Sequence, residues 1–270
     1  MNSPAGASRL NIILAALPDV ERQRVRRNLK PVSMPLGEVI HEAGVQLDGV
    51  YFPTTAIVSL QYELADGTCA EMAVVGSEGV VGTAVYMGMG GDTTSSRAVV
   101  ESPGLGYRLN RQILKEEFRR GGAMQHLLLR YAQALITQMA QAIACNRHHS
   151  VDQQFCRWLL GRLDRLDSND LITTHEFIAD RLGVRRESVT DAAGNLQNAG
   201  LIRCRRGHIT VADRAGLEAR CCECYAVVRQ ETDRLLQISD RFADKAAPKS
   251  GMSLRPHRVV KSHEDAGIAT

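Results

Sequence analysis

The sequence predicts an α+β protein with a β-rich N-terminal part, a long helix and a compact, mainly helical C-terminal part. Three observations support this prediction. Residues 31–109 contain short β-type runs punctuated by turns, about ten residues apart. Beyond residue 110 the apolar positions follow the period of a helix. Residues 173–199 then read as two short helices joined at a glycine, with a hairpin after them.

The composition is typical of a packed protein. Hydrophobic residues make up 44% and charged residues 23% of the 270 residues, which excludes disorder and collagen-like repeats. At roughly 150 residues per domain, two domains are expected. The net charge of +3 is too small to indicate nucleic acid by itself. Aromatic residues, at 4%, are too scarce for a platform that stacks single-stranded bases.

The cysteine content and the apolar runs indicate the compartment. The seven cysteines are odd in number and scattered, so we expect a reducing, cytoplasmic location. Residues 1–18 have little positive charge and no convincing cleavage site, so no signal peptide is expected. No apolar run approaches the roughly 18 residues that a membrane helix needs, and no membrane partner is expected.

The N-terminal third has helix signals first and strand signals afterwards. The apolar spacing of residues 9–30 predicts short helices that lead into a domain. Further on, Asp66-Gly67 lies between alternating apolar segments and is a strong hairpin signal. Short strands at regular spacing favour a sandwich or a barrel.

Residues 113–146 predict a long helix with two neighbouring apolar stripes. A helix that is apolar on two sides must bury both sides, here against its own β-rich part and against a partner helix. We assign the dimer contact to residues at heptad-like spacing: Leu128, Tyr131, Leu135, Met139 and Ala142. The second stripe contains Leu129, Ala132, Ile136, Met139 and Ile143. A helix wholly buried within one domain is the alternative.

The segment from Thr173 to Ala199 has the signals of a helix-turn-helix. Thr173 or Thr174 marks the start of the first helix, with Glu176 or Phe177 three residues later, and Thr173 with Glu176 forms a capping-box pattern. Gly183 lies where a tight turn between helices needs a positive φ. The second helix, from about residue 185, places its apolar side chains inward and its charged ones outward. A helical hairpin with an ordinary solvated face is the alternative.

The exposed residue types suit DNA. In a helix-turn-helix the start of the second helix meets base edges in the major groove. Arginine there binds guanine and glutamate accepts from cytosine, while hydroxyl side chains and the arginines of a following β-hairpin wing contact phosphates. The candidate DNA-binding residues are Thr173, Thr174, Arg185, Arg186, Glu187, Ser188, Thr190, Arg203, Arg205 and Arg206.

These residues resemble those of the Crp/Fnr family of bacterial transcription regulators. Residues 183–189, Gly-Val-Arg-Arg-Glu-Ser-Val, are similar to the family's recognition-helix start, and residues 196–202 to its run into the wing. Residues 36–44 are similar to its first β segment, and residues 76–85 fall at its phosphate-cassette position. The resemblance spans about residues 15–240.

The resemblance implies a domain order and partners. Residues 1–110 would form a double-stranded β-helix sensor domain, a jelly roll like that of cyclic-nucleotide-binding proteins, with N-terminal helices. Residues 111–150 would form the dimerisation helix and residues 151–242 the winged helix-turn-helix DNA-binding domain. Residues 243–270, poor in apolar side chains, would be a flexible tail. The implied partners are a second copy of the chain and a two-fold-symmetric duplex operator, with RNA polymerase as a further candidate.

The sequence departs from the family at the effector site. The family's cyclic-nucleotide binders carry Gly-Glu and Arg-Ser/Thr-Ala, whereas the corresponding residues here are Gly82-Thr83 and Ser96-Arg97. On a strand, a displacement of one residue turns a side chain to the opposite face. Sensing of cyclic AMP is therefore disfavoured, no cofactor is evident, and the effector stays open. Asp191 stands where many members have arginine, so their operator does not transfer.

Other chemistry has weak support in the sequence. No catalytic motif is recognisable, so we expect no enzyme. No cysteine precedes Cys69, which disfavours the family's N-terminal iron–sulfur cluster. We expect Cys221, Cys222 and Cys224 to be packing or surface thiols, since three on one helix cannot face one ion. The histidines His126, His148 and His149 are expected at solvated positions, and no metal site is predicted. A thiol-based sensor and a ligand-binding module whose winged helix contacts only proteins are the remaining alternatives.

Overall fold

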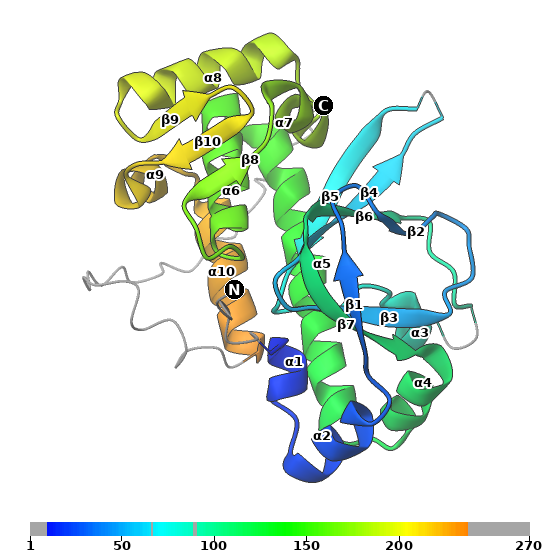
Figure 1. Ribbon diagram of the computed structural model, residues 1–270. Helices are drawn as coiled ribbons and strands as arrows, with labels where there is room; N and C mark the ends of the chain where they lie inside the picture. The colour runs from blue at the N-terminus through cyan, green and yellow to red at the C-terminus, as the bar shows by residue number, and fades with distance from the viewer. Residues whose placement is uncertain (1–9, 66, 89–90, 237–270) are drawn as a thin grey trace, which may run out of the picture. The chain divides into compact units, whose positions relative to one another are not determined.

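The computed structural model describes residues 10–65, 67–88 and 91–236 (Figure 1). The predicted tail, residues 243–270, and Asp66 of the predicted hairpin turn lie outside these residues. The described residues belong to one compact unit. Among their helices, none combines the length and apolarity that crossing a bilayer requires.

The N-terminal part is a β-roll made of two antiparallel sheets, preceded by the short helices α1 (Ile12–Ala15) and α2 (Asp19–Arg26). One sheet has the strand order β1-β7-β3 and the other the order β2-β6-β4-β5. The strands are β1 (Lys30–Met34), β2 (Val39–His41), β3 (Gly49–Pro53), β4 (Ile57–Glu63), β5 (Cys69–Val75), β6 (Arg97–Ser102) and β7 (Gly104–Asn110). The expected sandwich or barrel is thus present, and β4 and β5 form the predicted hairpin.

The predicted long helix is interrupted. Helix α4 spans Arg111–Arg119 and helix α5 spans Ala123–His148, with the short α3 (Ala84–Met87) earlier in the chain. The break falls at Gly121, which has a φ of +71° that ordinary side chains rarely adopt. Glu21 of α2 then caps α5, because its carboxylate accepts hydrogen bonds from the backbone N–H groups of Ala123 and Met124, both at 3.0 Å. A carboxylate at a helix N-terminus also interacts favourably with the helix dipole.

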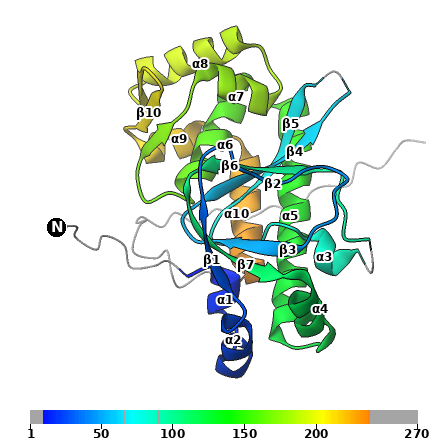
Figure 2. The same cartoon turned by 45° about the vertical axis from the view of Figure 1, so that its right-hand side comes forward.

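The C-terminal part contains four more helices around a small sheet of order β8-β10-β9 (Figure 1; Figure 2). Its core centres on Trp158, Leu159, Ile178 and Leu196, all at most 2% exposed. Further along the chain, α10 packs along α5. The elements are α6 (Val151–Leu163), β8 (Asp170–Ile172), α7 (His175–Leu182), α8 (Arg186–Asn198), β9 (Ile202–Arg205), β10 (His208–Val211), α9 (Arg214–Arg220) and α10 (Glu223–Leu236).

The two stripes of α5 are exposed very differently, and this corrects the assigned dimer contact. Leu128, Tyr131, Leu135 and Ala142 are at most 7% exposed and pack inside their own chain. Tyr131 lies so close to Gly79 that a Cβ added there would be 2.5 Å from its ring. Met139 is partly buried against the same core. Three members of the other stripe are exposed instead, because Leu129, Ile136 and Ile143 are 47%, 52% and 71% exposed, whereas Ala132 of that stripe is 4% exposed.

Candidate nucleic-acid interface

The first helix of the pair, α7, begins one residue later than the capping pattern suggests. The Thr174 hydroxyl accepts a hydrogen bond from the Phe177 backbone N–H at 3.1 Å and caps the helix. Of the two threonines that the sequence offers as the cap, Thr174 is confirmed, and the capping box of Thr173 with Glu176 is not formed. The Thr173 hydroxyl is buried and has no hydrogen-bond partner among the described residues, so it is not available to a phosphate in this conformation. Two consecutive threonines give the same local signal, and packing decides between them.

The turn between α7 and α8 is the one that the sequence predicts. Gly183 ends α7 with a φ of +66°, the left-handed conformation. The next residue, Val184, donates its N–H to the Ala179 carbonyl at 3.0 Å, which closes the helix end. The second helix begins at Arg186 and buries Val189, Ala192, Ala193 and Leu196.

The start of α8 is exposed and carries charge. Arg185, Arg186 and Glu187 are all exposed. No side chain in the described part of the chain caps the N-terminus of α8. The first backbone N–H groups of a helix have no partner within the helix, so an uncapped start can donate to an anion. Ser188, which follows Glu187, is half-buried. This end of α8 thus combines exposed charged side chains with backbone donors that no side chain caps.

Two contacts link α7 to the exposed face of α8. The guanidinium of Arg186 lies 3.6 Å from the Glu176 carboxylate, and both side chains are largely exposed. His175 Nδ1 lies 3.1 Å from the Thr190 hydroxyl, which donates to the Arg186 carbonyl. Burial lowers the pKa of His175, and the Arg186 charge lowers it further. His175 was not among the predicted site residues, and the signal that could have found it is its position directly after the Thr174 cap.

The wing supplies a second group of positive charge. Strands β9 and β10 pair antiparallel, with Arg205 opposite His208 and Arg203 opposite Thr210. Alternation along β9 places Arg203 and Arg205 on the face opposite buried Ile202, and Arg206 lies at the exposed turn. Within residues 10–65, 67–88 and 91–236, no carboxylate pairs with these three arginines. They are therefore available to a polyanion.

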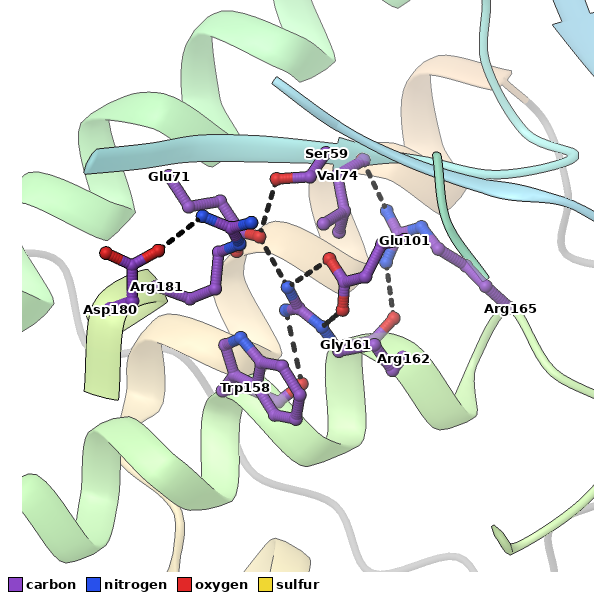
Figure 3. Close-up of polar contacts among 10 residues, drawn as sticks. All are labelled: Ser59, Glu71, Val74, Glu101, Trp158, Gly161, Arg162, Arg165, Asp180 and Arg181. Carbon is purple, nitrogen blue, oxygen red and sulfur yellow. Dashed lines mark hydrogen bonds and ion pairs between the residues drawn. The ribbon is translucent and has the colours of Figure 1, made fainter. Parts of the chain in front are cut away.

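A buried group of charges joins the winged helix to the β-roll (Figure 3). Arg162 of α6 donates from Nε to Glu101 Oε1 at 2.7 Å and from Nη2 to Glu71 Oε2 at 2.5 Å. Arg165 pairs with Glu78 at 2.7 Å. Burial would raise the pKa of Glu71, but Arg162 outweighs burial and lowers it, whereas burial prevails and raises the pKa of Glu101. One arginine thus pairs with two carboxylates of the β-roll.

Two of the four candidate effector residues already have polar partners within the β-roll. Arg97 pairs with the Glu42 carboxylate at 3.0 Å, and the Ser96 hydroxyl bonds to Thr94. Gly82 is buried, and Thr83 is the N-cap residue of α3. In the described part of the chain, no hydrogen bond or ion pair connects one pair to the other. A pocket along β1 and β7 is lined by none of these four residues.

The thiols and histidines near the end of α5 correct two expectations. His149 is not a solvated side chain without a cysteine partner, because its Nδ1 lies 3.5 Å from Cys224 Sγ. Cys222 and Cys224 are not isolated from other thiols, because Cys145 of α5 lies beside Cys222. Cys145 and His149 are far from Cys222 and Cys224 in sequence, and the contact between α5 and α10 brings them together.

The fold is a winged helix-turn-helix that a long helix connects to an N-terminal β-roll. Residues 153–220 match the family model of the Crp-like helix-turn-helix domain. The chain therefore carries a DNA-binding helix-turn-helix of the Crp type. No curated relative matches the chain.

Solved structures of Crp/Fnr regulators share the fold. A putative transcriptional regulator of the Crp/Fnr family from Eubacterium rectale is 18% identical, with a TM-score of 0.60 over 77% of this chain and 96% of that one. FixK2 from Bradyrhizobium japonicum is 16% identical, with a TM-score of 0.59 over 72% and 98%. The c-di-GMP-responsive regulator CLP from Xanthomonas campestris is 14% identical, with a TM-score of 0.58 over 72% and 99%. The chain has the Crp/Fnr fold: a β-rich N-terminal domain, a long helix and a C-terminal helix-turn-helix.

Proposed function

We propose that the protein is a homodimeric, sequence-specific regulator of transcription that binds duplex DNA through α8. The exposed, uncapped start of α8 carries this proposal. Arg186 is suited to guanine O6 and N7, and Glu187 to cytosine N4. Arg203, Arg205 and Arg206 of the wing supply phosphate contacts, and such contacts provide most of the non-specific affinity for DNA.

The second copy of the chain would bind at the exposed stripe of α5. Leu129, Ile136 and Ile143 are spaced seven residues apart, the repeat by which two helices pack along a common seam. Their side chains are large and apolar, and their own chain leaves them about half exposed or more. A two-fold axis along this seam pairs each stripe with itself, as an isologous dimer requires.

The dimer sets the form of the operator. Two copies of α8 related by a two-fold axis read a two-fold-symmetric site, with half-sites about one helical turn, roughly 34 Å, apart. A signal that changes the position of α8 relative to the axis would change the affinity for that site.

The charges around Arg162 are the proposed route for such a signal. Glu71 and Glu101 belong to β5 and β6, so a ligand that shifts these strands acts directly on α6 and, through it, on the helix-turn-helix core. The route does not require cyclic AMP, and the pairing of Arg97 with Glu42 does not support a phosphate contact there.

Salt dependence of duplex binding tests the proposal. Binding through phosphates makes the affinity fall steeply as salt rises, with a slope of about −0.9 per phosphate contact in a plot of log K against log salt. The measurement is fluorescence anisotropy with labelled duplex and full-length protein. Charge reversal of Arg203 and Arg205 should weaken binding to all sequences alike. Absence of salt-dependent binding would favour the alternative in which the winged helix contacts only proteins.

A further inference from the structure

Three thiols and one imidazole gather where α5 ends and α10 begins. Cys145 lies in the last turn of α5, and His149 is its C-cap residue. Cys222 immediately precedes α10, and Cys224 lies in its first turn. The four potential ligand atoms all lie within 4.8 Å of one another. The two groups come from segments more than 70 residues apart, so their meeting is a property of the fold.

Two of the distances between these atoms are those of a tetrahedral metal site. Cys145 Sγ lies 3.6 Å from Cys222 Sγ, and Cys224 Sγ lies 3.5 Å from His149 Nδ1. Zinc binds thiolate sulfur at about 2.3 Å and imidazole nitrogen at about 2.0–2.1 Å, so tetrahedral ligand atoms are roughly 3.5–3.8 Å apart. Small movements of the side chains bring the remaining distances into this range.

The surroundings have the features of an outer shell around a metal. His149 Nε2, the nitrogen that faces away from Cys224, lies 3.4 Å from the Glu223 carboxylate. A carboxylate on the second nitrogen fixes the tautomer and the ring orientation of a zinc-binding histidine. On the other side, Arg157 donates from Nε to Cys145 Sγ at 3.2 Å. Three thiolates and one divalent cation leave a net charge of −1, which the Arg157 guanidinium offsets.

Burial and stoichiometry indicate a structural site. Cys145, Cys222 and Cys224 are at most 5% exposed, and His149 is half-buried. Four protein ligands leave no open position for a substrate, which is the arrangement of structural zinc sites. The neighbouring Cys221 packs against this cluster without being one of the four, and its thiol lies 4.0 Å from the Gln153 carbonyl.

We propose that Cys145, His149, Cys222 and Cys224 bind one zinc ion. The ion would connect the end of the long helix to the start of α10, directly after the winged helix. It would therefore hold the DNA-binding part against the helix that we assign to the dimer. Soft thiolate ligands with one imidazole favour Zn²⁺ over hard cations such as Mg²⁺ or Ca²⁺.

The test measures metal in the full-length protein, purified anaerobically under reducing conditions. We expect about one zinc per chain by mass spectrometry of metals. Replacement by Co²⁺ should give the visible absorption of a tetrahedral site together with a thiolate-to-cobalt charge-transfer band. Cys224→Ser should weaken zinc binding at least about 100-fold. Glu223→Gln changes an exposed side chain without removing a ligand and should weaken it about 10-fold or more.

Cys221→Ser is the matched control, because it removes the adjacent thiol and leaves the four ligands in place. Its zinc content and affinity should equal those of the unmodified chain. A reduced, folded chain that binds neither Zn²⁺ nor Co²⁺ would overturn the proposal. So would an equal loss in Cys221→Ser and Cys224→Ser, or a Cys145–Cys222 disulfide in protein from reducing cytoplasm. Duplex binding, measured on the same samples, distinguishes failure of this site from failure of the proposed DNA-binding function.

Discussion

Among single side chains, Arg186 is the one on which base recognition depends in this account. Its ion pair with Glu176 is long and exposed, and such pairs contribute little. The guanidinium is therefore free to exchange this partner for guanine. Arg186→Ala should cost about 1–3 kcal/mol of binding free energy on the preferred site and relax the preference at one position in each half-site. Anisotropy titrations on matched and single-mismatch duplexes measure both effects.

Arg119→Ala provides the control for this change. It removes the same charge from an exposed position on α4, outside the helix-turn-helix. Its affinity and base preference should match those of the unmodified chain. If Arg186→Ala weakens binding equally on every sequence, Arg186 contacts phosphate rather than a base.

Replacing Gly183 and replacing Gly194 by alanine should change the stability of the fold in opposite directions. A Cβ would meet nothing within 4 Å at either position, so only backbone conformation matters. Gly183 has a φ of +66°, and Gly183→Ala should lower the free energy of unfolding by about 1–2 kcal/mol. Gly194 lies inside α8, where alanine is the better helix former, and Gly194→Ala should raise it by about 0.5–1 kcal/mol. Urea unfolding without DNA checks the opposite signs.

His175 makes stability depend on pH. Burial and the Arg186 charge lower its pKa in the folded chain below the ordinary value of 6.5. The unfolded chain therefore binds more protons over this interval, and the free energy of unfolding rises with pH. This contribution is complete above about pH 6.5 and is lost as pH falls through the lowered pKa. Urea unfolding at several pH values should give a flatter profile for His175→Gln. Identical profiles would show that His175 is not responsible.

Among the elements, α5 carries the proposed dimer contact. Ile136 lies in the middle of the exposed stripe and contacts the partner helix in the proposed dimer. Ile136→Asp would place a carboxylate opposite its own copy, so we expect monomers and at least a tenfold loss of operator affinity. Sedimentation and anisotropy measure the two effects. Val20→Asp, on the exposed side of α2, is the control and should leave the dimer unchanged.

Helix α6 depends on its buried charges. Arg162→Ala would remove the ion-pair partner of buried Glu71 and Glu101, on which Arg181 acts only at longer range, and the free energy of unfolding should fall by about 3–5 kcal/mol. Changing Glu71 and Glu101 to Gln together with Arg162→Met removes all three charges and should recover most of this loss. Chemical unfolding compares the variants. A small effect of Arg162→Ala alone would mean that water reaches the carboxylates.

Local signals predicted some elements better than others. Helices α7 and α8 were predicted almost to their ends, because a cap, a glycine and an apolar period all lie within the segment. The two stripes of α5 were also recognised, but periodicity alone does not show which stripe faces the β-roll. Packing of Tyr131 against Gly79 decides this. Cys145 and Cys222 are 77 residues apart in sequence, so only the tertiary contact reveals their proximity.

In the proposed dimer, two copies of α8 bind one duplex. The proposed seam on α5 and the exposed start of α8 lie on the same chain within one compact unit. The ion pairs of Arg162 with Glu71 and Glu101 connect α6 to the β-roll, so the β-roll and the helix-turn-helix part are physically linked. A change at the β-roll can then alter the separation of the two recognition helices, which operator spacing restricts to about 34 Å.

Selection of bound duplexes from a random pool tests directly whether two copies of α8 read one two-fold-symmetric site. We expect a two-fold-symmetric consensus with half-sites about 10 base pairs apart, centre to centre. We also expect one position of each half-site to lose its preference in Arg186→Ala. Recovery of an asymmetric consensus, or of no consensus at all, from protein that is folded and dimeric would show that α8 does not read DNA in the proposed way.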